Sequence, residues 1–459
     1  MSRPDPAPAM PASDAPVPDD LSFRPARVRP WRVARRLLRG RAPGQVVIQY
    51  TTRCNAACAQ CGMAVQHGGA RHTLDPDGLR REIDAMARAG VAAVSFTGGE
   101  PLLCLDEIAP LMRHAAAAGI PFIRTGTNGA VFRHWDRPDF PARVARLAAA
   151  LADTPLQTFW ISLDSADPAC HEANRGLPGV VEGVRRALPI LHEHGVFPAA
   201  NLGINRLTGG PGLVPPGSAP FDPAALAEAF RRAFRRFYRF VLDLGFVTAN
   251  ACYPMSGEPE AEDAVYAATS GADMIRFRPE EKAVLFRTLS EVIPEFRHRL
   301  RIFTPRSALH ALARQAEGRD AGRWPCRGGI DFFFLGAEDM QAYPCGYRGG
   351  EGLGPFRGLD LDGPAPAAHC ERCEWECFRD PSVLLGPVLA ARGNPLRLAR
   401  ALLRDRTFAR LWWEDLRYYR ACQWFNARQR PDFRRLAAFG RDAAAPAGQA
   451  GGGPSTAAT

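Results

Sequence analysis

Three cysteines near the start of this 459-residue chain are spaced as in a metal-binding loop. The segment TTRCNAACAQCGM places Cys54, Cys58 and Cys61 in the pattern C-x3-C-x2-C. Three thiolates can bind three irons of a [4Fe–4S] cluster and leave the fourth iron open to a substrate or cosubstrate. The alternative is a zinc loop, but zinc normally takes a fourth protein ligand near by, and the next histidine, His67, is poorly placed for that. The spacing therefore indicates a reactive iron–sulfur site.

A second group of cysteines lies in residues 324–380. This segment is rich in glycine and poor in long apolar runs, so we expect a metal group to staple it. Four thiolates saturate one cubane cluster, so five cysteines suffice for one cluster and not for two. A four-cysteine zinc knot is the alternative. The five cysteines are Cys326, Cys345, Cys370, Cys373 and Cys377.

Four cysteines stand outside both groups. For Cys104, Cys170 and Cys422 we expect buried, inert thiols. Cys252 differs because it ends an expected strand on the rim that faces the site. There a thiol could donate a hydrogen atom or bind iron, which makes Cys252 a candidate catalytic residue.

The elements that would position these residues alternate between strand and helix. The periodicity predicts strands over Val46–Tyr50, Ala92–Thr97, Phe122–Gly126, Thr158–Ser162, Phe197–Ile204 and Phe246–Cys252. It predicts helices that begin at Asp75-Pro76, at Leu105, at Val180, near Pro223 and near Pro279, with a further helix that ends near Leu151. Six strand–helix units imply an α/β fold with a parallel sheet, open or rolled into a barrel.

The rest of the chain divides by composition. We expect a disordered or basic leader over 1–44, the barrel over 45–300, a cysteine-rich domain over 301–385 with a connector near 300–320, a helical extension over 386–440 and a disordered tail over 441–459.

Charge and hydropathy exclude some classes of protein. The net charge is +10, but Lys282 is the only lysine and the excess of arginine fits GC-rich coding bias, so nucleic acid is not expected as a partner. No apolar run of about 18 residues occurs, and the N-terminus lacks the pattern of a signal peptide. We therefore expect a cytoplasmic protein in which the cysteines bind metal rather than form disulfides.

The motifs at the strand ends resemble the radical S-adenosylmethionine (radical SAM) superfamily. The three-cysteine loop follows the first strand, and Thr97-Gly98-Gly99-Glu100-Pro101 at the second resembles the family's GGE-P turn. Thr125–Gly129 at the third strand resembles its T-N-G turn. Ser162-Leu163-Asp164 ends the fourth strand, and HEANRG (His171–Gly176) resembles H-x-x-x-R-G. Four such pieces in order, each at a carboxyl-terminal strand end, do not fit a chance match.

This resemblance implies a partial (β/α)6 barrel that binds a [4Fe–4S] cluster and SAM. One electron from the cluster would cleave SAM to methionine and a 5′-deoxyadenosyl radical, which abstracts hydrogen from the substrate. The open iron would bind the amino and carboxylate groups of SAM. The family's pattern assigns SAM contacts to Gly98, Gly99, Glu100, Thr127, Asn128, Ser162, Asp164, Arg175 and Asn201. One departure is Gln60, where the family usually has a large apolar residue near the adenine.

The second cysteine group resembles the auxiliary-cluster extension called SPASM when it holds two clusters and Twitch when it holds one. The resemblance rests on the Cys-x-Gly start at Cys326 and on Tyr343-Pro344-Cys345. It implies one auxiliary [4Fe–4S] cluster held by Cys326, Cys345, Cys370 and Cys373, with Cys377 as the alternate ligand. The family's glycine five positions before the second cysteine is Met340 here, so we expect the hairpin to turn differently.

The sequence leaves the substrate open. Peptide-modifying relatives often carry a leader-binding domain before the barrel, and the segment before Val46 is too short for one. We therefore expect a small molecule, a glycan or a lipid-like substrate, with a peptide maturase as the alternative and a non-catalytic electron-transfer or zinc-stapled protein as the alternative of a different class. A flavodoxin- or ferredoxin-type electron donor is the expected partner.

Two flanks, Arg24–Arg41 and Pro395–Phe433, combine arginine with aromatic and apolar residues. They fit helices that pack on the barrel. They also fit a surface that contacts a membrane or an anionic substrate. The aromatic residues concerned are Trp412, Trp413, Tyr418, Tyr419, Trp424 and Phe425.

Overall fold

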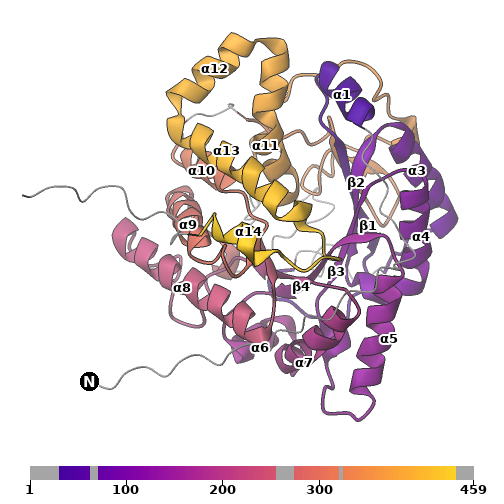
Figure 1. Ribbon diagram of the computed structural model, residues 1–459, viewed down its shortest axis with the longest axis vertical. Helices are drawn as coiled ribbons and strands as arrows, with labels where there is room; N and C mark the ends of the chain where they lie inside the picture. Colours follow the sequence, from indigo (N-terminus) through magenta and orange to yellow (C-terminus); the bar gives the residue numbers. More distant parts are fainter. Residues whose placement is uncertain (1–29, 62–70, 255–272, 320–323, 441–459) are drawn as a thin grey trace, which may run out of the picture.

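The computed structural model describes residues 30–61, 71–254, 273–319 and 324–440. At its centre is a nine-stranded sheet in the order β7-β6-β5-β4-β3-β2-β1-β8-β9, parallel except for the β8–β9 pair (Figure 1). The expected α/β fold with a parallel sheet of six strand–helix units is confirmed. The strands are β1 (Gly44–Thr51), β2 (Val91–Gly98), β3 (Phe122–Thr127), β4 (Leu156–Leu163), β5 (Ala199–Gly203), β6 (Thr248–Cys252), β7 (Arg301–Ile302), β8 (Phe332–Leu335) and β9 (Ala342–Tyr343).

The helices begin where the sequence places capping residues. Asp75 accepts a hydrogen bond from Gly78 N at the start of α3, and Asp222 caps α8 in the same way, with a proline at the first helical position of each. The helices are α1 (Pro30–Leu38), α3 (Pro76–Arg88), α4 (Leu105–Ala117), α5 (Phe140–Ala152), α6 (Pro168–Arg175), α7 (Val180–Glu193), α8 (Pro223–Leu244), α9 (Pro279–Val292), α10 (Arg306–Ala316), α11 (Glu376–Gly393), α12 (Pro395–Arg404), α13 (Arg406–Ala421) and α14 (Phe433–Ala437). None of these described helices is long and apolar enough to cross a membrane.

The main core lies between the sheet and the helices on its outer face. In Figure 1, α3, α4 and α5 lie along one side of the sheet, and α8 and α9 lie at the other. Along β4, Phe159, Ile161 and Leu163 are buried in this core, whereas Thr158 and Trp160 on the opposite face keep accessible surface. This alternation shows that the helices cover one face of the sheet, while side chains on the inner face are only partly buried.

Several segments are more ordered than the sequence indicates. Residues 30–44 of the expected leader contain α1, and the expected connector near 300–320 contains β7 and α10. Helix α11 spans the expected domain boundary at 385/386. Its two internal prolines, Pro381 and Pro387, are unfavourable in a helix, so the sequence does not indicate one continuous helix there. The tail 441–459 and His67 lie outside the described residues.

The cysteine-rich segment joins the barrel through the sheet itself. Strand β8 pairs in parallel with β1, from Gln45↔Phe332 to Ile48↔Leu335, and then returns as β9. Met340 has a positive φ of 57°, a left-handed conformation that costs a methionine more than a glycine. The expectation that the hairpin turns differently from the family's stays a prediction.

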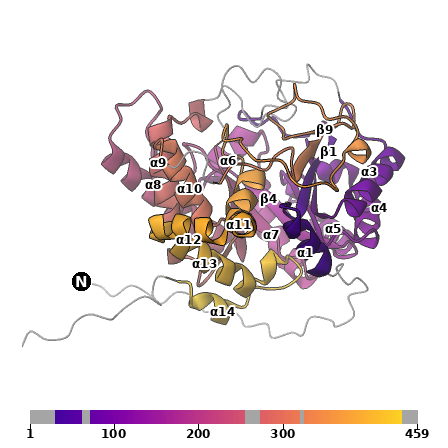
Figure 2. The ribbon, with the colours of Figure 1, turned by 90° about the horizontal axis from the view of Figure 1, so that it is seen from above.

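The C-terminal extension covers the amino ends of several barrel strands, as seen from above in Figure 2. Ala427 N donates to Gln157 O at 2.9 Å, and Phe197 N donates to Ala427 O at 2.7 Å. Tyr418 is fully buried and its hydroxyl accepts from Ile302 N at 2.8 Å. Tyr419 and Phe425 are buried as well, whereas Trp413 and Trp424 are exposed; Trp412 is half-buried and donates to Leu384 O.

Candidate functional site

The three-cysteine loop packs directly on the Gly98–Glu100 turn. Gly99 N donates to Thr51 O at 2.7 Å, and Glu100 N donates to Arg53 O at 2.8 Å, which ties the end of β2 to the chain that leads into Cys54. A Cβ on Gly99 would lie 2.0 Å from Arg53 O and 3.0 Å from the Cβ of Cys54. Glycine is therefore required there because the backbones of the two motifs touch.

The thiols of this loop face a common region. Cys54, Cys58 and Cys61 are half-buried and close enough for Cys61 to act on the ionisation of both others. Burial raises the pKa of Cys58 to about 11, with Arg175 opposing the rise. A bound metal is therefore needed to hold these sulfurs as thiolates, as is usual for cysteine ligands.

The donors of the cysteine loop are all sulfur. Within the described ranges, no three His, Cys, Asp or Glu side chains converge closely enough to hold one ion. The soft, all-sulfur donor set fits an iron–sulfur cluster.

Glu100 is buried at the junction of two predicted motifs. Its carboxylate accepts hydrogen bonds from Asn128 N at 2.7 Å and Leu102 N at 3.1 Å, and it also contacts the Thr127 hydroxyl. Burial raises the pKa of Glu100 to about 7 despite these hydrogen bonds. The Asn128 side chain donates to Asn55 Oδ1 at 2.9 Å and lies 3.6 Å from Cys54 Sγ. The GGE-P and T-N-G turns thus meet beside the first cysteine.

Asp164 and Arg175, the two residues assigned to SAM at the fourth unit, bind each other. Arg175 Nε and Nη2 donate to the two carboxylate oxygens at 2.7 and 2.8 Å. Burial opposes ionisation of Asp164, but Arg175 outweighs it and holds the pKa of Asp164 below its usual value. His171 accepts a hydrogen bond from Asp164 N, and burial lowers its pKa to about 4, so the histidine is neutral and positions the strand end.

Two residues that we did not assign to the site complete this network. Gln60 Nε2 donates to Asp164 Oδ2 at 2.8 Å, and Asn174 Nδ2 donates to Gln60 Oε1 at 2.8 Å. Ala57 N also donates to Arg175 O, so the cysteine loop and α6 are joined by backbone as well. The signal in the sequence was the polar Gln60 at a position that is usually apolar in the family. Its side chain binds the Asp164 carboxylate.

The remaining predicted residues lie on the inner face of the barrel. Ser162 and Asn201 are paired across β4 and β5, and both keep accessible surface. The Asn201 amide contacts the Cys252 thiol at 3.3 Å and its oxygen accepts from Asn250 at 2.9 Å. Asn201 therefore groups with Cys252 rather than with Asp164 and Arg175.

The second cysteine group divides into four residues and one. Cys345, Cys370 and Cys373 each lie close enough to Cys326 for the two thiols to influence each other's ionisation. Cys345 also lies close enough to Cys370 for the same effect. Cys326 N donates to Cys370 O at 2.8 Å, and a Cβ on Gly328 would lie 2.7 Å from Pro344 O, beside Cys345. Aromatic residues surround the group, among them Phe332, Phe334, Tyr343, Trp375 and Phe378.

Cys377 points elsewhere. Its thiol contacts Glu376 Oε1, its backbone oxygen accepts from Gln45 Nε2, and Arg124 of β3 is the cation near it. Glu376 is also hydrogen-bonded by the Cys252 thiol. The Cys377 thiol thus contacts Glu376 and lies near Arg124, while Cys377 packs on the same aromatic cluster as the other four cysteines. Of the other thiols, Cys104 and Cys422 are buried in apolar cores and Cys170 is half-buried.

Comparison with known proteins adds the family. Residues 48–215 match the model of the radical SAM superfamily. These residues form a radical SAM domain. The matched residues contain the cysteine loop and every strand-end motif described above. The second cysteine group lies outside the matched residues.

Curated relatives share the radical SAM domain over part of their length. GTP 3′,8-cyclase 2 of Mycobacterium tuberculosis (strain ATCC 25618 / H37Rv) is 38% identical over 140 residues, which are 28% of this chain and 34% of the relative. AdoMet-dependent heme synthase of Methanosarcina barkeri (strain Fusaro / DSM 804) is 28% identical over 152 residues, 33% of this chain and 40% of the relative. The chain thus spans a third to two-fifths of the length of these relatives.

Solved structures resemble the chain at low identity. A structure titled native anSMEcpe with bound AdoMet and Kp18Cys peptide has a TM-score of 0.45 and 15% identity, and covers 69% of this chain and 78% of that one. SuiB of Streptococcus suis bound to precursor peptide SuiA has a TM-score of 0.44 and 14% identity, with 70% and 64% covered.

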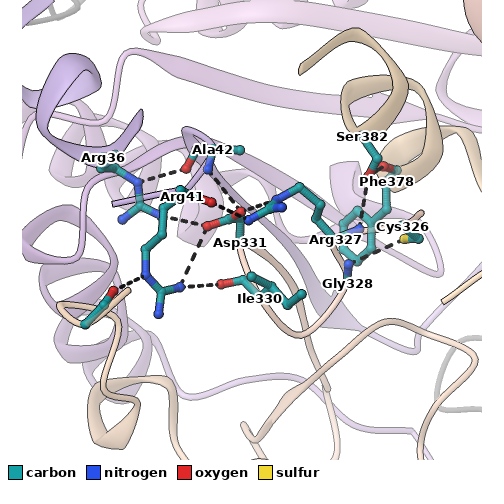
Figure 3. Close-up of polar contacts among 12 residues, drawn as sticks. Arg36, Arg41, Ala42, Cys326, Arg327, Gly328, Ile330, Asp331, Phe378 and Ser382 are labelled. Atoms are coloured by element: carbon teal, nitrogen blue, oxygen red, sulfur yellow. Dashed lines mark hydrogen bonds and ion pairs between the residues drawn. The ribbon is translucent and has the colours of Figure 1, made fainter. Parts of the chain in front are cut away.

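A buried carboxylate ties the segment before the radical SAM domain to the second cysteine group (Figure 3). The Asp331 side chain is fully buried and is paired with Arg36 at 3.2 Å, Arg41 at 3.8 Å and Arg327. It also accepts from Ala42 N at 3.0 Å. Arg327 directly follows Cys326, so this ion cluster fixes the backbone that carries the cysteine.

Replacing Asp331 by asparagine should destabilise the protein by about 3–5 kcal/mol, because buried guanidinium groups lose their only anion in the cluster. Iron content should fall together with stability, since Cys326 shares this backbone. Denaturant unfolding and iron assays measure both. The control is Asp362→Asn, which breaks only an exposed pair with Arg39 and should change stability by less than about 0.5 kcal/mol. Equal stability of the two variants would contradict the prediction.

Proposed function

We propose that the protein is a radical SAM enzyme that reductively cleaves SAM and abstracts hydrogen from a small-molecule substrate. The observation that carries the proposal is the junction of the Cys54–Cys61 loop with Glu100, Asn128 and Arg175. It brings soft metal ligands, a buried carboxylate and a buried guanidinium together at the carboxyl ends of the strands. When bound, the cluster and SAM together supply a 5′-deoxyadenosyl radical.

Each residue has a role that follows from its surroundings. Cys54, Cys58 and Cys61 hold the cluster and leave one iron open. Glu100 binds the SAM ammonium. Gly98 and Gly99 allow the backbone to approach SAM closely, and Thr127 and Asn128 hold the Glu100 carboxylate in place. Arg175 binds the SAM carboxylate. Asp164 holds the guanidinium in place through two short hydrogen bonds, and Ser162 and Asn201 remain proposed ribose contacts.

We also propose one auxiliary [4Fe–4S] cluster on Cys326, Cys345, Cys370 and Cys373. Support comes from their mutual proximity inside an aromatic core and from the orientation of Cys377 away from them. This cluster would accept an electron from the substrate radical or anchor the substrate. A flavodoxin- or ferredoxin-type protein is the proposed donor of the first electron.

A small-molecule substrate is favoured by the names of the relatives over the shared domain. GTP 3′,8-cyclase and AdoMet-dependent heme synthase are named for reactions of small molecules, not of peptides. The polar inner face of the barrel, with Ser162, Asn201 and Asn250, suits a polar ligand.

The test is anaerobic incubation of the reconstituted, reduced protein with SAM. We expect slow formation of 5′-deoxyadenosine without substrate. Glu100→Gln should weaken SAM binding by roughly ten- to a hundredfold, because the neutral amide loses a charge-assisted hydrogen bond, while the iron content stays constant. The matched control is Glu193→Gln, an exposed glutamate at the last residue of α7. Accumulation of S-adenosylhomocysteine without 5′-deoxyadenosine would instead indicate methyl transfer.

A further inference from the structure

The inner face of the barrel carries polar side chains that are only partly buried. On β5 and β6, Asn201, Asn250 and Cys252 keep accessible surface, while Leu202 and Ala251 between them are buried in the outer core. The first turn of α11 adds Glu376, whose carboxylate bonds the Cys252 thiol. Polar side chains that are not fully buried set this face apart from the apolar outer core.

Arg124 is the unusual member of this inner face. It lies in the middle of β3, in register with Ser95 of β2 and Thr158 of β4. Its Nε and Nη2 atoms are shielded from solvent and have no hydrogen-bond partner among the described residues. Among the described residues, the Cys377 side chain is the ionisable group that lies near the Arg124 guanidinium.

Other arginines of this chain show which groups the Nε and Nη2 atoms of a guanidinium bind. Arg175 uses Nε and Nη2 to grip both oxygens of Asp164, and Arg235 uses the same two atoms on Glu295 at 2.7 and 2.9 Å. This two-point geometry matches carboxylate and phosphate oxygens. In Arg124 the same pair of donors lies inside the protein without an anion, an arrangement that costs free energy unless a ligand supplies one.

We propose that Arg124 binds a carboxylate or phosphate group of the substrate inside the barrel, through its Nε and Nη2 atoms. The proposal assigns an anionic substrate to the enzyme. It rests on the proposed function. The unpartnered Oε2 of Glu376 lies near Cys377 as well, and offers an acceptor to a donor group of the same ligand. Arg124 sets specificity; it holds the substrate and takes no part in the electron transfer.

The first experiment measures thermal stability and needs no substrate. In the reconstituted protein, Arg124→Met should leave Tm unchanged or raise it, because it removes a buried charge that has no partner. The matched control is Arg301→Met, since Arg301 is buried on β7 with its donors bonded to Thr248, Cys422 and Asn426; its Tm should fall by several degrees. A fall in Arg124→Met as large as in Arg301→Met would show a structural role and overturn the proposal.

The second experiment identifies the anion. A deuterated cell extract is separated by anion exchange, and each fraction is assayed for transfer of deuterium into 5′-deoxyadenosine. We expect the label from the retained fraction. Phosphatase treatment should abolish it for a phosphate, and methyl esterification should abolish it for a carboxylate. Arg124→Met should raise the half-saturating amount of that fraction at least tenfold, and Arg124→Lys should restore part of the loss.

The outcomes separate the two proposals. Label from the unretained fraction, with wild-type protein that forms 5′-deoxyadenosine, would overturn the anionic substrate and leave the radical SAM activity standing. Absence of 5′-deoxyadenosine in every sample would overturn the proposed function itself. In that case the stability comparison still decides whether Arg124 is a structural residue.

Discussion

Replacing Cys54, Cys58 and Cys61 together by alanine will abolish 5′-deoxyadenosine formation and remove about half of the bound iron. The reconstituted wild-type protein should hold roughly eight irons and eight sulfides, as two cubanes, and the variant roughly four. The loss of product should exceed a thousandfold, because under the proposed function these cysteines would hold the cluster that binds SAM and supplies the electron. Iron and sulfide assays with chromatographic detection of 5′-deoxyadenosine measure both effects.

The control for this variant is Cys170→Ala, which removes a half-buried thiol of α6 outside both cysteine groups. It should retain all the iron and the activity. Stoichiometric zinc without labile sulfide in the wild-type protein would contradict the iron–sulfur assignment. Retention of all iron by the triple variant would place both clusters elsewhere.

Local patterns made the strand ends predictable. Helices α8 and α9 begin and end at the expected residues because Asp222-Pro223, Pro279 and the apolar periodicity between the ends are signals within each helix. The turns at Gly98–Glu100 and at Asn128 also follow strands that could be recognised. In a parallel sheet these strand ends share one edge, so the meeting of Glu100 with Asn128 and the cysteine loop could be inferred without coordinates.

Long-range pairing could not be read in this way. The bond between Gln60 and Asp164 joins residues 104 positions apart, and β8 pairs with β1 across nearly 300 residues. No local sequence pattern around either partner identifies the other. The part of helix α11 before residue 386 was not predicted as helix, because its prolines contradict helix propensity; in the structure the helix packs against α10 and α12. The only local signal for the role of Arg124 is that it is the one charged residue in the strand sequence FIRTGT.

The basic flanks show how composition can mislead. Arg36 and Arg41 fit a membrane-binding surface by residue type, yet the structure pairs both with buried Asp331. Tyr418 and Phe425 lie in a core that closes one end of the barrel. Membrane contact through the exposed apolar residues, such as Trp31 and Leu403, stays a prediction.

The ligands of the second cluster can be decided by two serine substitutions four positions apart. Cys373→Ser should lower the iron content from roughly eight to roughly four, while the signal of the SAM-binding cluster is kept, because a serine hydroxyl does not replace a thiolate on iron. Cys377→Ser should retain all the iron. Its side chain lies in the first turn of α11, directed to Glu376 and Arg124, and its backbone oxygen is bonded to Gln45. To reach the other cysteines, that turn would have to unwind and release Gln45. Mössbauer spectra and iron assays of both variants give the answer, and loss of four irons in Cys377→Ser, with none lost in Cys373→Ser, would exchange the two residues in the ligand set.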